Sequence, residues 1–191
     1  MRAQAFFLAA ALPLAAALPL AAALPFAAGC RYDPVPQEII DSLGPEVGTP
    51  SASHRPGQPC NVCHSAYEGA SPAFAVAGTV FLKADDGTIG PAAGVNIVIS
   101  DSAAGLRKAC TNTAGNFFVR KDDWVDITFP LTAQAGNRGM TSLIGRDGSC
   151  ASCHKLPDAA SEDPLTGAGH GTPGMILLDP TTLGEACGGG Q

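Results

Sequence analysis

Basic residues are scarce in this chain. Lys and Arg together number 11 against 17 Asp and Glu, so the formal net charge at pH 7 is -6. Apart from Arg2, all of them follow Cys30, and they occur singly or in adjacent pairs. A surface that binds nucleic acid needs a cluster of positive charge, which this sequence lacks. We therefore expect no nucleic-acid partner.

Histidine is scarcer still, with four residues in the whole chain. Two of the four, His64 and His154, directly follow a pair of cysteines spaced C-x-x-C. From composition alone, that coincidence has a chance of about one in two thousand. The sequence also lacks the strand-helix-strand alternation that a thioredoxin-type redox pair requires. These absences argue against a thioredoxin-type redox pair and direct attention to the two histidines.

Charge is almost missing from the first 29 residues, where Arg2 is followed by an apolar run that ends in small residues. This pattern predicts a secretory leader. The run is long enough for a membrane-spanning helix, but Pro13, Pro19 and Pro25 argue against a regular helix. Residues 27–30 resemble the lipobox of bacterial lipoproteins, which implies that Cys30 receives lipid and becomes the mature N-terminus. Secretion without a lipid is the alternative.

The predicted leader also indicates the cellular location of the protein. We expect an exported lipoprotein, anchored in a membrane by its N-terminal lipid and facing the periplasm. Arg31, rather than Asp, follows the lipid-bearing cysteine. By resemblance to known lipoprotein sorting, this favours the outer membrane.

The rest of the chain divides by composition. We expect a leader at 1–29, a proline-rich tether at 30–58, a first C-x-x-C-H segment at 59–70, a β-rich domain at 72–146, and a second such segment with a tail at 147–191.

Period-two alternation dominates residues 74–144 and predicts short, half-buried strands. One face carries Val76, Gly78, Val80 and Leu82 in the first run, Val95, Ile97 and Ile99 in the second, and Val125, Ile127, Phe129, Leu131, Ala133 and Ala135 in the third. Turns are expected at residues 85–87, 104–105, 114–116 and 136–137. Residues 175–178 form a last short strand. The fold class is mainly β with few short helices, a single antiparallel β-sandwich flanked by the two C-x-x-C-H segments.

Three stretches of this β region carry a family resemblance: residues 77–81 (AGTVF), 91–99 (PAAGVNIVI) and 111–119 (TNTAGNFFV). They resemble the transthyretin-like sandwich of carboxypeptidase regulatory-like domains. The resemblance covers about fifty residues and implies a structural or binding module without catalytic residues of its own. A sandwich of another lineage is the alternative.

The seven cysteines fall into groups by context. Cys30 belongs to the lipobox, and four others form the C-x-x-C pairs Cys60/Cys63 and Cys150/Cys153. Cys110 and Cys187 stand alone. Because an exported protein meets an oxidising compartment, we expect these two to pair in a disulfide.

The segments Cys60-Asn61-Val62-Cys63-His64 and Cys150-Ala151-Ser152-Cys153-His154 resemble the attachment sites of c-type cytochromes. Two thiols one helical turn apart suit thioether bonds to one haem, and the following histidine reaches its iron. The sequence thus predicts two haem c groups, with His64 and His154 as proximal ligands. Zinc bound by the four thiols is the alternative.

The second axial ligand decides between electron transfer and small-molecule chemistry. The candidates are His54, His170 and Met175, and Met140 is a further methionine candidate. His54 lies only ten residues before His64, so we expect it to reach the other haem more easily. All of these residues have ordinary alternatives, as loop histidines or, for Met175, as the start of the last strand. The aromatic residues Trp124, Phe117, Phe118 and Phe129 are expected in the core, and Tyr67 near a haem edge or on the surface.

Together these features predict a lipid-anchored di-haem cytochrome c for periplasmic or cell-surface electron transfer, rather than an enzyme. It requires a redox partner protein, which the sequence does not identify. The alternatives are a haem enzyme or sensor for peroxide or a gas, and a zinc-stabilised binding module. No recognisable distal acid/base set supports the enzyme.

Overall fold

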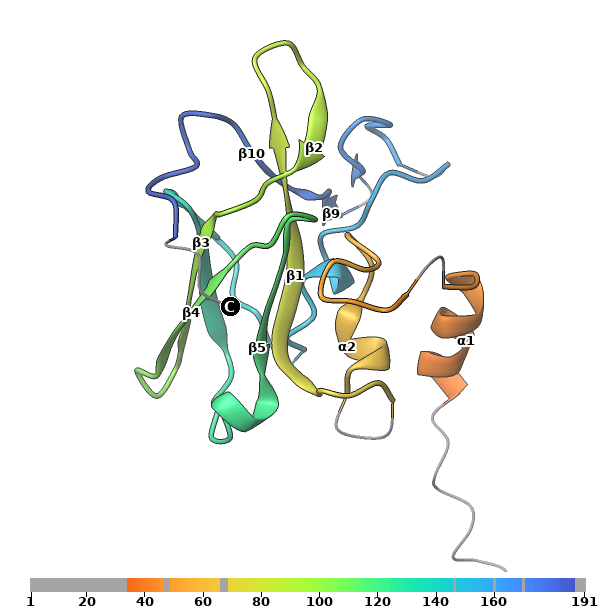
Figure 1. The fold of residues 1–191 in the computed structure, drawn as a ribbon, viewed down its shortest axis with the longest axis vertical. Helices are drawn as coiled ribbons and strands as arrows, with labels where there is room; N and C mark the ends of the chain where they lie inside the picture. Colours follow the sequence, from red (N-terminus) through yellow and green to blue (C-terminus); the bar gives the residue numbers. More distant parts are fainter. Residues whose placement is uncertain are drawn as a thin grey trace, which may run out of the picture. The chain divides into compact units, whose positions relative to one another are not determined.

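A long strand, β1 (Phe74–Lys83), lies at the centre of the computed structural model (Figure 1). The structure describes residues 34–46, 49–65, 69–145, 147–159, 161–169 and 171–187. The predicted leader, the predicted lipid attachment site Cys30, Tyr67 and His170 lie outside these residues. Internal contacts divide the chain after Val35, and everything below concerns the unit Pro36–Gln191.

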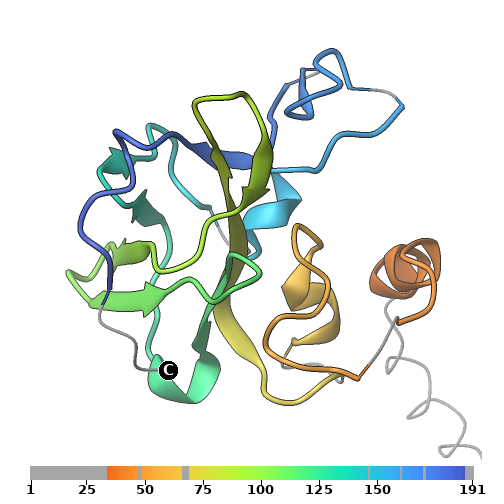
Figure 2. The ribbon, with the colours of Figure 1, turned by 45° about the horizontal axis from the view of Figure 1, so that its top comes forward.

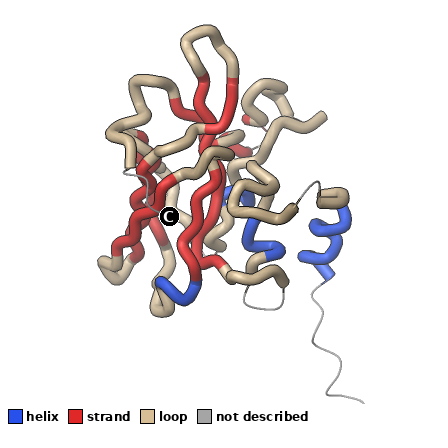
Figure 3. The backbone as a smooth tube through the Cα atoms, viewed as in Figure 1, coloured by secondary structure: helices blue, strands red, loops and turns tan. Residues whose placement is uncertain are grey.

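Over the residues that the structure describes, the helices are few and short, as expected. They are α1 (Pro34–Ser42), α2 (Cys60–Cys63) and the two 3-10 turns η1 (Lys121–Asp123) and η2 (Cys150–Ser152). The remaining elements are strands, which Figure 3 shows in red. The protein is therefore mainly β.

The first sheet is built around β1. Its partners are β2 (Ile89–Pro91) and β5 (Asn116–Arg120), both antiparallel, and β10 (Ile176–Leu178). Strand β10 runs parallel to β1, with Val80 opposite Ile176. The prediction of a wholly antiparallel arrangement is wrong at this strand. A parallel neighbour requires a long crossover rather than a hairpin, and the whole second C-x-x-C-H segment lies in that crossover.

The second sheet is antiparallel and has the order β4 (Leu106–Cys110), β3 (Asn96–Asp101), β6 (Leu131–Ala135) and β7 (Arg138–Gly139). A separate small hairpin pairs β8 (Ala168–Gly169) with β9 (Thr172–Pro173). The predicted turn at residues 85–87 joins β1 to β2, and the one at 136–137 joins β6 to β7. Gly87 and Gly136 adopt the positive φ that such tight turns favour.

One hydrophobic core receives side chains from both larger sheets. The predicted inward faces of the first two runs are confirmed, because Val76, Val80, Ile97 and Ile99 are all buried. Trp124, which follows η1, is also buried in this core, as expected. The alternation in the sequence thus identifies the core-facing side chains of β3. Strand β1 is instead buried on both faces from Ala75 to Val80, so the prediction that it is half-buried is wrong.

The third predicted strand begins later than the pattern indicates. Residues 125–130 form turns and loop, Val125 is 79% exposed, and β6 starts only at Leu131. Pro130 has no amide hydrogen to donate to a neighbouring strand, which places the start of pairing after it. The prediction of a strand from Val125 is therefore wrong, although its second half is confirmed.

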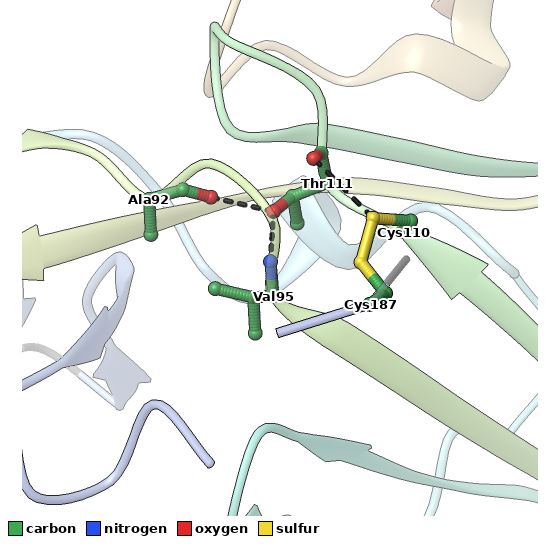
Figure 4. The surroundings of a disulfide bond; sticks show 5 residues. All are labelled: Ala92, Val95, Cys110, Thr111 and Cys187. Carbon is green, nitrogen blue, oxygen red and sulfur yellow. Dashed lines mark hydrogen bonds between the residues drawn. A yellow bond between two sulfur atoms is a disulfide. The ribbon is translucent and has the colours of Figure 1, made fainter. Parts of the chain in front are cut away.

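A disulfide joins Cys110, the last residue of β4, to Cys187 in the C-terminal tail, with the two Cα atoms 5.9 Å apart (Figure 4). This is the pair that the sequence singled out. Next to it, the buried hydroxyl of Thr111 donates to the carbonyl of Ala92 and accepts from the amide of Val95. The disulfide attaches the C-terminal tail to the end of β4.

No helix in the described part of the chain combines the length and apolar character that crossing a membrane demands.

Candidate functional site

The two C-x-x-C-H segments fold into the same local structure. Residues 60–63 form the single turn α2, and the amide of His64 donates to the carbonyl of Cys60 at 2.9 Å. Residues 150–152 form the turn η2, and the amide of His154 donates to the carbonyl of Cys150 at 2.8 Å. A spacing of three residues brings both cysteines of a pair to one side of such a turn.

Both histidines direct Nδ1 to a backbone carbonyl further along the chain. Nδ1 of His64 lies 2.7 Å from the carbonyl oxygen of Pro72, and Nδ1 of His154 lies 2.9 Å from that of Gly174. A carbonyl oxygen can only accept, so Nδ1 carries the proton in each ring. Nε2 is then left with a free lone pair, the state in which histidine binds a metal.

Both turns pack against strand β1, and Figures 1 and 2 show them on the same side of it, α2 in yellow and η2 in light blue. The amide of Phe74 donates to the carbonyl of His64, and the amide of Ala77 donates to the carbonyl of Gly148 just before the second turn. The two motifs, which lie on either side of the predicted β region in sequence, therefore both contact strand β1.

Gly78 on β1 is a position where Cys150 of the second motif lies very close to the strand. A Cβ atom at this position would lie 2.7 Å from Cβ of Cys150 and 2.9 Å from its Sγ. The glycine thus provides the space into which Cys150 packs.

The four thiols of the two motifs are unpaired. Burial raises the pKa of the Cys60 thiol, with the nearby Cys63 adding to the shift. Burial also raises the pKa of the Cys150 thiol to about 12, and Cys60 is the next cause, which reflects the proximity of the two motifs. Cys153, in contrast, is exposed.

A cleft of about 380 Å³ opens beside the first motif. Its walls include both cysteines and the histidine of that motif, aromatic and aliphatic side chains, and two arginines: Leu43, His54, Arg55, Cys60, Cys63, His64, Phe74, Phe117, Phe118 and Arg120. The expectation that the strand aromatics belong to the core holds for Trp124 and Phe117. Phe117 and Phe118 also line this cleft.

An aromatic stack forms one side of the cleft. The ring of Phe74 lies between those of His64 and Phe118, with centroid distances of 4.3 and 4.7 Å. Phe74 was not identified from the sequence. Its position at the start of β1, just after the first motif, is the signal that would have found it.

His54 lies beside His64, with ring centroids 5.8 Å apart and planes tilted by 39°. Both histidines line the same cleft. The expectation that His54 reaches the other motif more easily does not agree with this placement, because the chain between the two histidines turns back on itself.

Met175 is buried and leads directly into β10, and its amide donates to the carbonyl of Thr166. This is the ordinary structural role that the sequence offered as an alternative. Met140 follows β7 and is half-buried.

Within the described ranges, no three His, Cys, Asp or Glu side chains gather as ligands of a metal ion. His154 differs from His64 in its surroundings, since it is only half-buried. Burial lowers its pKa, and the charge of Arg138 lowers it further, against the opposing effect of the Gly174 carbonyl.

Comparison of the chain with protein-family models, with curated proteins and with solved structures gave no match.

Proposed function

We propose that this protein is an exported, lipid-anchored cytochrome that carries two haem c groups and transfers electrons in the periplasm or at the cell surface. Cys60 and Cys63 would hold one haem and Cys150 and Cys153 the other, with His64 and His154 as the proximal ligands.

The observation that carries this proposal is the repeated histidine geometry. In both motifs the amide of the histidine closes the turn, and Nδ1 faces a carbonyl eight or twenty residues downstream. A zinc site made of four thiolates has no use for two histidines held in this way. A haem site requires an imidazole whose Nε2 can bind the iron, and this hydrogen bond supports that role by keeping a proton on Nδ1.

The residues around the first motif also fit a haem. The cleft has an apolar aromatic side, formed by Phe74, Phe117 and Phe118, for a flat macrocycle. Arg120, also in its lining, offers positive charge for propionates. Haem c supplies a one-electron redox centre when it is bound. The protein's part is to fix the ligands and limit the access of water.

The packing of both turns on β1 supports transfer between two centres within one chain. Cys60 and Cys150 are close enough for the charge of one thiol to affect the other. Groups attached to these two side chains would be neighbours. The connection that leads to β10 brings the second motif back to β1.

The β domain is proposed to be a sandwich of the transthyretin type, related to carboxypeptidase regulatory-like domains. Two sheets that share one core, and the Asn112 turn that leads into β5, support this fold. We assign it the role of a scaffold for the two motifs, anchored to the membrane through lipid on Cys30.

The test is expression of the full chain in a bacterial host that has the cytochrome c maturation system. Intact mass and a pyridine haemochrome spectrum should give two covalent haems per chain. The double variants Cys60→Ser/Cys63→Ser and Cys150→Ser/Cys153→Ser should each retain one. Zinc without iron in the purified protein would select the zinc-bound module, and high-spin bands with carbon monoxide binding would select the enzyme or sensor.

A further inference from the structure

His54 and His64 share one cleft with both cysteines of the first motif. Their ring centroids are 5.8 Å apart, although ten residues separate them in sequence. Two imidazoles on opposite sides of one iron have ring centres about this far apart, since each nitrogen lies about 2 Å from a metal. The spacing of the two rings would therefore allow both histidines to bind one metal ion.

The backbone of His54 is fixed by a buried hydrogen-bond network that reaches across the first sheet. The side-chain amide of Asn116 on β5 donates to the carbonyl of His54 at 2.8 Å. The hydroxyl of Thr79 on β1 donates to Asn116 at 2.7 Å and accepts from the amide of Gly57 at 2.7 Å. Thr79 and Asn116 are both buried. Such a network positions a loop more tightly than a surface turn does.

The Nδ1 atom of the His54 side chain is buried and has no hydrogen-bond partner. The nearest acid is Glu46, 4.0 Å away, which is itself held by an ion pair with Arg55. A buried nitrogen without a partner loses its hydrogen bonds to water and gains none in return, so buried polar groups of this kind are rare without a functional reason.

We propose that His54 is the second axial ligand of the iron bound by His64. The inference rests on the proposed function and makes the first site a low-spin haem with two histidine ligands. His54 would supply a nitrogen lone pair to the iron, and forming this bond would transfer no electron. Asn116 is a positioning residue for His54, because its side-chain amide donates to the His54 carbonyl.

The test uses single-haem backgrounds, so that each spectrum belongs to one site. In the Cys150→Ser/Cys153→Ser protein, which keeps the first haem, His54→Gly should convert the low-spin spectrum to high spin. Added imidazole should restore the low-spin spectrum, because it fills the space left by the side chain. In the Cys60→Ser/Cys63→Ser protein, His54→Gly should leave the spectrum of the second haem unchanged.

The role of Asn116 has its own readout. In the first-haem background, Asn116→Ala should give a mixture of high and low spin, whereas Thr79→Ser, which keeps the hydroxyl, should remain low spin. Thermal unfolding of each variant checks that the β domain is intact.

A low-spin first haem that survives His54→Gly would overturn the assignment, and so would a change confined to the second haem. Both outcomes leave the proposed function standing. Absence of covalent haem from the unmodified protein would instead remove the proposed function itself.

Discussion

The two C-x-x-C-H turns have the same backbone and different surroundings. His64 is buried in an aromatic stack, beside a second histidine and a cleft. His154 is half-buried, Cys153 is exposed, and Cys150 packs into the space left by Gly78. The five-residue motif therefore dictates the turn and the histidine's first hydrogen bond, while distant parts of the chain decide how each site is enclosed. Variants that act on one motif and spare the other test this difference.

The disulfide should give the largest effect. It closes a loop of 77 residues that contains the second motif but not the first. In the double variant Cys110→Ser/Cys187→Ser, we expect the free energy of unfolding to fall by about 4 kcal/mol, because the unfolded chain gains freedom. Urea unfolding measures the total. Hydrogen exchange should accelerate more around Cys150 than around Cys60, and equal acceleration at both would contradict the expected difference.

Thiol reactivity should separate the cysteines in the haem-free chain. The pKa of Cys150 is raised to about 12, so its thiolate is rare at pH 8, whereas Cys153 is exposed. We expect iodoacetamide to modify Cys153 at least about a hundredfold faster than Cys150, since the thiolate is the reactive form. The rate at Cys150 should rise as the pH approaches 12. Peptide mass spectrometry gives both rates, and similar labelling of the two at pH 8 would sink the prediction.

A methyl group at Gly78 should act chiefly on the second motif. In Gly78→Ala the new Cβ would meet Cβ and Sγ of Cys150 and the ring of Phe117. We expect a loss of about 1–3 kcal/mol in stability, the usual cost of overpacking. Gly90→Ala on β2 is the matched control, because its Cβ would meet nothing within 4 Å. Thermal unfolding compares the two, and equal stability would show that Cys150 can move aside.

The smallest effect concerns the start of each turn. Asp147 accepts hydrogen bonds from the amide of Ser149 and the hydroxyl of Ser152, whereas Pro59 gives the first turn no side-chain cap. Asp147→Ala should cost about 0.5–1 kcal/mol and loosen only the second turn. The exposed Asp126→Ala serves as control in the same unfolding measurements. A loss no larger than that of the control would mean that Asp147 does not hold the turn.

Much of the β domain could be predicted from local patterns. Ile97 and Ile99 alternate with half-buried residues on β3, and both lie in the core, as do Val76 and Val80 of β1. The pattern misled where Pro130 interrupts it, because alternation reports which face is apolar and not whether a backbone amide can pair. It also gave no sign that both faces of β1 are covered.

The surroundings of the motifs depended on contacts that no local pattern encodes. Asn116 reaches the carbonyl of His54 across 62 residues of sequence, and β10 pairs with β1 only after a long crossover. Phe74 gains its position against His64 from the chain reversal after the first motif. The turns, their histidines and the Cys110–Cys187 pair were accessible to sequence reasoning, whereas the cleft and the position of His54 beside His64 were not.

The disulfide has a further consequence for a cut chain. The loop between η2 and β8 has exposed residues such as Leu165, where a protease would find access. A single cut there separates the second motif from Gly174, whose carbonyl holds His154, but the bond between Cys110 and Cys187 keeps both pieces together. The nicked protein would migrate as one species without reductant and as two with it. The tethered piece would stay at high local concentration beside β1 and could rebind there.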